Sequence, residues 1–349
     1  MFPRNHYPSY MWYKFIITII ITSVNWRDHR LLKFPGVPGL VNVSAKWNLV
    51  PIHSNLYPFK DVPQKGLIDR IVSALDLEDC NLKQTPAPTE PLGRDLEGEP
   101  FNEIFNFASV VGMMLHLCNH TRSDIAFAVY QCARYTHNPT AKHGQYLLCI
   151  GWYLKGTREF GALLQPSTGL NSILQCYSDA DFAGIFKVDH KEDPHCVKSR
   201  TGYIITLNNC SVSWGSKLQT ATALSTMEAE YIALSISCRE QLPLQHLLNE
   251  IELDVNLPFE LTTPIYSSIW EDNEGALKLA NMPLPRTTPH SKHFACKYHW
   301  IREHVSNTSS TPKDFVVKPI DTKDQITDIF TKGLAGPTFK KLRMDLLGW

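Results

Sequence analysis

Tyr177-Ser-Asp-Ala-Asp-Phe-Ala-Gly184 carries two aspartates, two residues apart, at the end of a stretch that alternates from Ile173 onward. This period of two predicts a β-strand over residues 173–182, in which Asp179 and Asp181 face the same side. The segments 202–207 and 211–214 predict two more strands, and the Asn-Asn-Cys sequence between them predicts a hairpin turn. An acidic strand beside a hairpin is therefore the centre of the predicted fold.

Helical and extended patterns alternate after this hairpin. Residues 226–253 predict a long helix that begins with a capping box, Ser225-Thr-Met-Glu228, and is kinked or broken at Pro243. Strands are also expected at 265–270 and 315–318, with further helices near 274–281, 290–304, 325–331 and 339–347. We expect an α/β unit over residues 169–349, with a mixed five-stranded sheet flanked by helices.

The preceding residues divide into two parts. Segments 66–75, 105–118, 122–135 and 141–155 have helical periodicity, so residues 65–168 are predicted to form a small, mostly helical unit. Residues 1–64 stay unassigned and are candidates for poor order. Their apolar run 15–24 is too short for a membrane helix, and its β-branched residues favour a buried strand. We expect no membrane association.

Composition narrows the class of protein. The chain has 349 residues, with Lys+Arg 34 and Asp+Glu 34, and 43% apolar residues. It can therefore bury real cores, and it is not a strongly basic nucleic-acid-binding chain. Its 9 cysteines include no C-x-x-C pair. This pattern favours reduced thiols and a cytoplasmic location, with a virus-like particle or the nucleus as alternatives.

Four carboxylates fall on or beside different predicted elements: Asp179, Glu230, Asp272 and Asp328. Hydrolysis of a phosphodiester by two Mg²⁺ or Mn²⁺ ions needs hard oxygen ligands that converge from separate elements. The residues alone leave two choices open. Asp181 shares a strand face with Asp179, and Glu228 precedes Glu230 by two residues on the predicted helix, where they point about 200° apart.

Seven motifs in this order resemble the ribonuclease H domain at the end of a copia-type retrotransposon polyprotein. They lie at 177–184, 199–203, 213–217, 223–234, 271–281, 291–299 and 324–332. The helical unit is similar to the thumb and connection that follow the polymerase palm of such an element. The resemblance implies a ribonuclease H-like sheet and a two-metal endonuclease that cleaves the RNA strand of RNA–DNA hybrids. It also implies Asp179, Glu230, Asp272 and Asp328 as catalytic and metal-binding residues.

The resemblance implies as partners an RNA–DNA hybrid and the rest of a retrotransposon polyprotein. A hybrid presents phosphates, and we expect the following cations to contact them: Lys217, Lys292, His293, Lys297, His299, Arg302 and Lys332. The sequence contains no adjacent Asp-Asp pair of the kind a polymerase palm requires, so we expect no polymerase activity from this chain alone. His290 stands where many relatives have arginine.

Two other interpretations compete with the nuclease. A catalytically silent retrotransposon remnant would keep the fold without enzymatic activity. An integrase-type strand transferase would share the fold, but the chain lacks the zinc-binding His/Cys pairs of that class. The order of a strand Asp, a helix Glu, a second strand Asp and a late Asp favours the ribonuclease.

Overall fold

The computed structural model describes residues 60–62, 64–77, 81–102, 104–164, 173–186, 195–254, 266–283, 286, 294, 296–305 and 314–349. Several sequence-based expectations lie outside the described residues. They are the strand at 15–24 and the residues His290, Lys292 and His293.

A mixed sheet forms the centre of the molecule, as the sequence predicts. Its strands are β3 (Ile173–Asp181), β4 (Arg200–Leu207), β5 (Cys210–Leu218), β6 (Tyr266–Glu271) and β7 (Val316–Pro319), in the spatial order β5-β4-β3-β6-β7. The first three strands are antiparallel, while β6 runs parallel to β3, and β7 runs parallel to β6. The carboxyl ends of β3 and β6 therefore meet at one edge of the sheet.

The predicted hairpin turn is confirmed. Leu207 pairs with Cys210, so Asn208 and Asn209 are the two turn residues. Their φ angles are 51° and 68°, a left-handed conformation that asparagine tolerates better than most residues. This turn fixes the register between β4 and β5.

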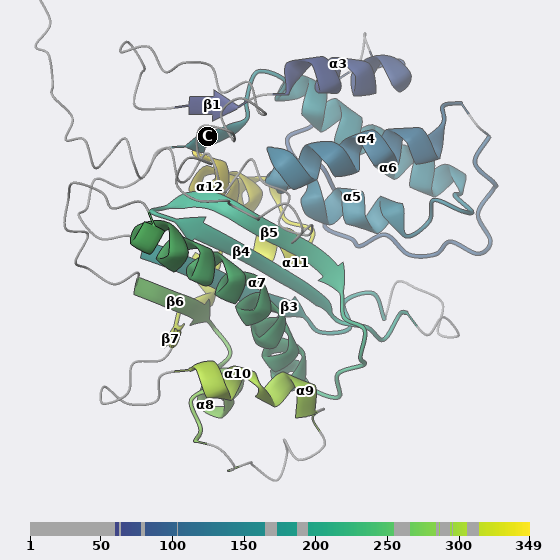
Figure 1. The fold of residues 1–349 in the computed structure, drawn as a ribbon. Helices are drawn as coiled ribbons and strands as arrows, with labels where there is room; N and C mark the ends of the chain where they lie inside the picture. Colours follow the sequence, from purple (N-terminus) through teal and green to yellow (C-terminus); the bar gives the residue numbers. More distant parts are fainter. Residues whose placement is uncertain are drawn as a thin grey trace, which may run out of the picture.

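Strand β4 is buried along its whole length because the sheet is covered on both faces. Tyr203 and Ile205 pack into the core beneath helix α7 (Thr226–Asp254), whereas Ile204 between them joins a second core on the other face. Helix α7 crosses the sheet (Figure 1). Pro243 lies inside this single helix, so the predicted break there is not observed.

Shorter helices complete the α7 side. They are α8 (Glu274–Ala280), α9 (Cys296–His299) and α10 (Ile301–His304). The single helix expected over 290–304 is thus two short helices in the described part. The remaining C-terminal elements are the 3-10 turn η4 (Thr322–Asp324), α11 (Asp328–Thr331) and α12 (Gly336–Leu347).

The helical unit packs against the second face of the sheet together with α11 and α12 (Figure 1). Its elements are α3 (Lys65–Ala74), α4 (Phe107–His120), the 3-10 turn η2 (Ser123–Ile125), α5 (Ala126–Ala133) and α6 (Ala141–Gly156), with a short ribbon of β1 (Lys60–Val62) and β2 (Ala162–Leu164). One continuous core joins Met114 and Leu147 of this unit to Phe330 and Phe339 near the C-terminus. The predicted boundary between 168 and 169 lies outside the described residues and stays a prediction.

A glycine in β4, Gly202, allows helix α11 to lie close against this strand. A Cβ atom on Gly202 would lie 2.6 Å from Thr331 Cγ2, 2.9 Å from Phe330 Cβ and 3.1 Å from the Thr327 carbonyl oxygen. No side chain fits there without a shift of backbone, so the glycine allows α11 to lie directly on β4.

Substitution of this glycine gives a first test of the packing. We expect Gly202→Ala to lower the free energy of unfolding by about 1–3 kcal/mol, because the added methyl group overpacks the contact with α11. Gly112→Ala is the matched control, since a Cβ at this helical position meets nothing within 4 Å; it should stabilise by about 0.5–1 kcal/mol. Urea unfolding of both variants measures the difference, and equal stability would contradict the packing argument.

Candidate metal centre

Three carboxylates from distant parts of the chain meet at the carboxyl ends of the central strands. Asp179, Glu230 and Asp272 each offer an oxygen atom, and these atoms all lie within 4.8 Å of one another. Asp179 belongs to β3, Glu230 to α7, and Asp272 directly follows β6. Carboxylate oxygens are hard, anionic ligands of the kind that Mg²⁺ and Mn²⁺ prefer.

The register of the parallel strands explains why two of the carboxylates are adjacent. Tyr177 is level with Trp270 in the β3–β6 pairing. Two residues further along each strand, the same offset brings Asp179 level with Asp272. Neighbouring strands lie about 4.8 Å apart, so side chains that are level on one face come within reach of a shared ion.

The start of α7 resolves the choice between its two glutamates. The Ser225 hydroxyl accepts a hydrogen bond from the Glu228 amide at 3.1 Å, and Glu228 Oε2 accepts one from the Leu224 amide at 2.8 Å. Glu228 therefore satisfies backbone donors at the helix N-terminus. Glu230 is the residue that joins the carboxylate cluster.

Asp181 is separated from the cluster despite sharing a strand with Asp179. Its carboxylate packs over the next turn, where a Cβ atom on Gly184 would collide with it. Asp181 is not a member of the group formed by Asp179, Glu230 and Asp272 among the described residues. Burial raises the pKa of Asp181, while Lys332 and Arg200 lower it.

Asp328 approaches the cluster through a lysine. It is the first residue of α11, and Lys332 Nζ lies 2.7 Å from its Oδ1 atom and 3.8 Å from Asp179 Oδ2. The Thr331 hydroxyl also donates a hydrogen bond to Asp179 Oδ2. The structure thus brings Asp328 beside Asp179, with an ammonium group between them.

Burial and mutual repulsion make the carboxyl groups of Asp179 and Glu230 hard to ionise. Burial, aided by Asp328 and Asp272, raises the pKa of Asp179 to about 7 in spite of Lys332 and the Thr331 hydrogen bond. Burial, with Glu271, Asp179 and Asp272 nearby, raises the pKa of Glu230 to about 11. A bound cation would offset this repulsion, which is the behaviour expected of metal ligands.

Glu271 is a fifth carboxyl group that sequence reasoning missed. It is fully buried beside Asp272, and its Oε1 atom accepts a hydrogen bond from the Asn273 amide at 3.1 Å. Burial raises its pKa well above the ordinary value. The sequence shows only adjacent Glu and Asp residues, and choosing between them needs the register of β6.

The chemistry of this group fits a divalent cation. Glu230 Oε2 is buried without a hydrogen-bond partner in the described structure. Such an oxygen is costly unless a proton or a cation satisfies it. Asp179, Glu230 and Asp272 are the residues that would hold the ion.

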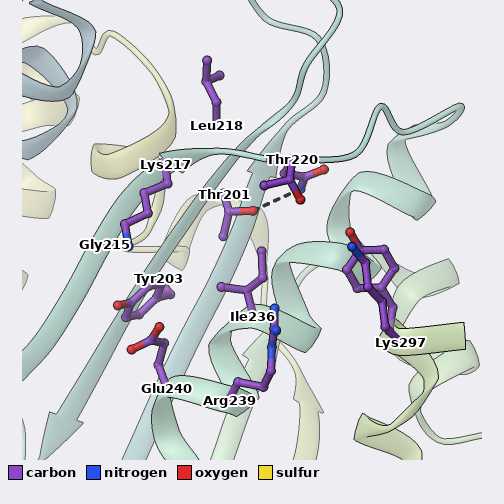
Figure 2. Close-up of a pocket in the computed structure, with 12 residues that line it drawn as sticks. Thr201, Tyr203, Gly215, Lys217, Leu218, Thr220, Ile236, Arg239, Glu240 and Lys297 are labelled. Carbon is purple, nitrogen blue, oxygen red and sulfur yellow. Dashed lines mark hydrogen bonds between the residues drawn. The ribbon is translucent and has the colours of Figure 1, made fainter. Parts of the chain in front are cut away.

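The predicted cations divide into surface groups and structural groups. Lys217 of β5 and Lys297 of α9 line one pocket of about 290 Å³, together with Arg239 and Glu240 of α7. Figure 2 shows the side chains of β4, β5 and α7 that surround it. Arg239 was not predicted, because nothing in its local sequence distinguishes it from other exposed helical residues.

Arg302 and His299 are corrections to the predicted cation set. Arg302 is 1% exposed, and its guanidinium donates hydrogen bonds to the carbonyl oxygens of Met282, Pro283 and Arg286. His299 Nδ1 lies 3.1 Å from the Tyr231 hydroxyl, and burial together with Arg302 lowers its pKa. A buried arginine and a neutral histidine do not offer exposed positive charge to the phosphates of a nucleic acid strand.

Lys332 stays a cation, but its partners are the carboxylates. Burial lowers its pKa, but Asp179 and Asp328 outweigh this and hold the pKa above its ordinary value. The sequence predicts a phosphate contact for this residue, whereas the structure directs its ammonium group into the acidic cluster.

A mixed sheet in this strand order, covered by helices and carrying clustered carboxylates at the ends of β3 and β6, defines a ribonuclease H-like protein. No protein-family model matches the chain. It is 32% identical over 295 residues to the retrovirus-related Pol polyprotein from transposon TNT 1-94 of Nicotiana tabacum, covering 82% of this chain and 20% of that protein. It is also 32% identical over 256 residues to the corresponding polyprotein from transposon RE1 of Arabidopsis thaliana, covering 73% of this chain and 16% of that one.

The chain belongs to the copia-type retrotransposon polyproteins, and it spans only 16–20% of the length of these polyprotein relatives. Among solved structures it is similar to LC11-RNase H1, isolated from compost by a metagenomic approach. That comparison has 15% identity and a TM-score of 0.29, and covers 48% of this chain and 96% of the other. The fold assignment therefore rests on the strand order and the arrangement of helices.

Within the described part of the chain, no helix combines the length and the apolar character needed to cross a bilayer.

The raised pKa of Asp179 gives a testable dependence of stability on pH. A carboxyl group whose pKa is higher in the folded state stabilises the fold below its unfolded pKa, near 3.8, and that contribution is lost as the pH rises through about 7. We expect Asp179→Asn to raise the melting temperature of the EDTA-treated protein at pH 8, by roughly 2–4 °C for each 1 kcal/mol regained.

At pH 4.5 the same substitution should change the melting temperature much less, because the wild-type carboxyl group is then largely protonated. Asp321→Asn is the control, since this carboxylate is exposed and pairs with Lys323 on the surface. A fall in melting temperature for Asp179→Asn at pH 8 would show that the carboxylate is needed for folding.

Proposed function

We propose that this chain is the ribonuclease H part of a copia-type retrotransposon polyprotein, and that it hydrolyses the RNA strand of RNA–DNA hybrids with two Mg²⁺ or Mn²⁺ ions. The observation that carries the proposal is the meeting of Asp179, Glu230 and Asp272 from three separate elements. Residues 65–168 would be the thumb and connection of the polymerase, and the remainder of the polyprotein would be a partner, in the cytoplasm or in a particle.

The roles of the chain's own residues follow from the site. Asp179, Glu230 and Asp272 would hold the ions, with Asp328 as the fourth carboxylate of the site. When bound, the ions supply activation of the attacking water and neutralise charge on the phosphate and the leaving oxygen. The Thr331 hydroxyl orients Asp179 through its hydrogen bond, and the glycine at position 202 keeps α11 close enough to maintain it.

The chain has no net charge, but one pocket is lined by three cationic side chains. This pocket supports the proposal that the chain binds a nucleic acid. Lys217, Arg239 and Lys297 line it from β5, α7 and α9 (Figure 2). Phosphates of one strand are the ligands that suit these side chains. Recognition of the hybrid would rest on groove shape and 2′-hydroxyl contacts more than on base sequence.

Cleavage of a labelled hybrid tests the proposed activity. We expect the wild-type protein with Mg²⁺ to cut the RNA strand, and Asp272→Asn and Glu230→Gln each to reduce the rate by about 100-fold or more, because each removes a carboxyl ligand of the ions. Glu228→Gln is the matched control: Glu228 lies two positions before Glu230 in the same helix, but its carboxylate accepts a hydrogen bond from the Leu224 amide at the start of the helix.

Three outcomes separate the interpretations. Cleavage by wild type and by Glu228→Gln, but not by the other variants, supports the nuclease. Silence from every protein supports the inactive remnant. Equal cleavage by all of them would mean that the reaction does not use this cluster.

The cationic pocket has its own test. We expect the double variant Lys217→Ala/Arg239→Ala to bind the hybrid more weakly, and its affinity to depend less steeply on salt, with the logarithmic slope reduced by about 1 for each lost phosphate contact. Lys278→Ala is the control, because this exposed lysine pairs with Glu274 on α8. Fluorescence anisotropy at several salt concentrations measures both quantities, and an unchanged slope would exclude the pocket from the binding surface.

A further inference from the structure

Lys332 occupies an unusual position for a nuclease cation. Its ammonium group lies 2.7 Å from Asp328 Oδ1 and 3.8 Å from Asp179 Oδ2, and its side chain is 40% exposed whereas that of Asp179 is 3% exposed. The lysine thus contacts the acidic cluster, and its side chain is partly exposed to solvent.

Asp179 takes part in two groups of contacts. Its Oδ2 atom faces α11, where it accepts the Thr331 hydrogen bond and lies near Lys332. Asp179 also belongs to the oxygen group with Glu230 and Asp272, and the described ion pairs of Lys332 involve neither Glu230 nor Asp272. Asp179 is therefore shared between a set of three carboxylates and a pair, Asp179 and Asp328, that already has a cation.

We propose that the Lys332 ammonium is a resident counter-ion that occupies the place of a second divalent cation between Asp179 and Asp328. This inference rests on the proposed function, because it assigns an order to the ions of the same site. The first ion binds to Asp179, Glu230 and Asp272 with the lysine in place. The second binds only when the lysine leaves.

Electrostatics makes the two cations exclusive. Positive charges a few ångströms apart repel strongly in a partly buried site, so an ammonium group and a divalent ion do not share one carboxylate pair. The lysine side chain is flexible and partly exposed, so it can leave the pair by rotating toward solvent. The exchange removes one positive charge from the pair and adds two, so that the divalent ion can neutralise both carboxylates.

Titration of the full chain with Mn²⁺, without nucleic acid, tests this exchange directly. Isothermal titration calorimetry on wild type is expected to show one ion per chain at submillimolar to millimolar concentration. Lys332→Met keeps most of the length of the side chain and removes its charge, so we expect a second ion, bound at least about ten-fold more tightly than any second ion in wild type. Lys332→Arg, which keeps a cation, should behave as wild type does.

Two controls separate this role from a general effect of charge. Lys278→Met removes an exposed lysine on α8 and should leave the titration unchanged. Lys332→Met combined with Asp328→Asn removes a ligand of the second ion, so this double variant should again bind one ion. An identical stoichiometry and affinity for wild type and Lys332→Met would overturn the inference.

A thermal measurement covers the case in which the charge-removed variant is less stable. Without metal, Lys332→Met leaves Asp179 and Asp328 without their cation, and we expect it to melt at a lower temperature than wild type. Added Mn²⁺ should raise its melting temperature by more than it raises that of wild type. An equal or smaller rise for Lys332→Met also overturns the inference.

The failure of the inference is distinguishable from failure of the proposed function. If wild type cleaves the hybrid and the lysine variants bind metal as wild type does, only the counter-ion role is lost. If neither wild type nor Lys332→Met binds Mn²⁺, and wild type does not cleave, both proposals are overturned.

Discussion

The parallel pairing of β3 with β6 is the constraint on which the candidate site depends. It aligns Tyr177 with Trp270, and so brings Asp179 level with Asp272. A slip of one residue would exchange Asp272 for Glu271 and turn the strand's apolar side chains to the wrong face. The fully buried Cys176 and Ile269, which share the core beneath α7, oppose such a slip. The hydrophobic core therefore determines the spacing of the carboxylates.

The second face of the sheet matters for the same site. Ile204 of β4 packs into the core that contains the helical unit, α11 and α12. Trp214 of β5 adds a direct connection, since its indole N–H donates to the Cys118 carbonyl oxygen at 2.8 Å. Because α11 carries Thr331 and precedes Lys332, the position of both groups relative to Asp179 depends on this packing. The helical unit therefore contributes to the geometry of the site without supplying a carboxylate to it.

Sequence patterns predicted the sheet, the hairpin and most helices, because the period of apolar residues records which faces are buried. They left Asp179 and Asp181 equivalent, since residues two apart share a strand face, and only the fold of the following turn separates them. They also left the glutamates of α7 unresolved until the hydrogen bond from the Leu224 amide to Glu228 was visible.

Charged residues on the predicted 290–304 segment were the weakest part of the sequence interpretation. Arginine is usually a surface cation, yet Arg302 is buried and donates hydrogen bonds to three backbone carbonyl oxygens. Arg239 lies on the pocket surface although no motif marks it. Which side chain faces a phosphate depends on contacts between elements, and these are absent from any local pattern.

The electrostatics of the cluster connect stability with function. Asp179, Glu230 and Glu271 are buried close together, and each has a raised pKa, so ionising all of them without a cation is unfavourable. Glu271 adds to this repulsion and helps to raise the pKa of Glu230, whereas Lys332 opposes it by placing a positive charge beside Asp179 and Asp328. Glu230 Oε2 and Glu271 Oε2 both remain buried without a hydrogen-bond partner in the described structure. A divalent ion beside Glu230 would neutralise the negative charge of the cluster. For this reason the residues that destabilise the metal-free fold are also the ones best suited to bind the metal.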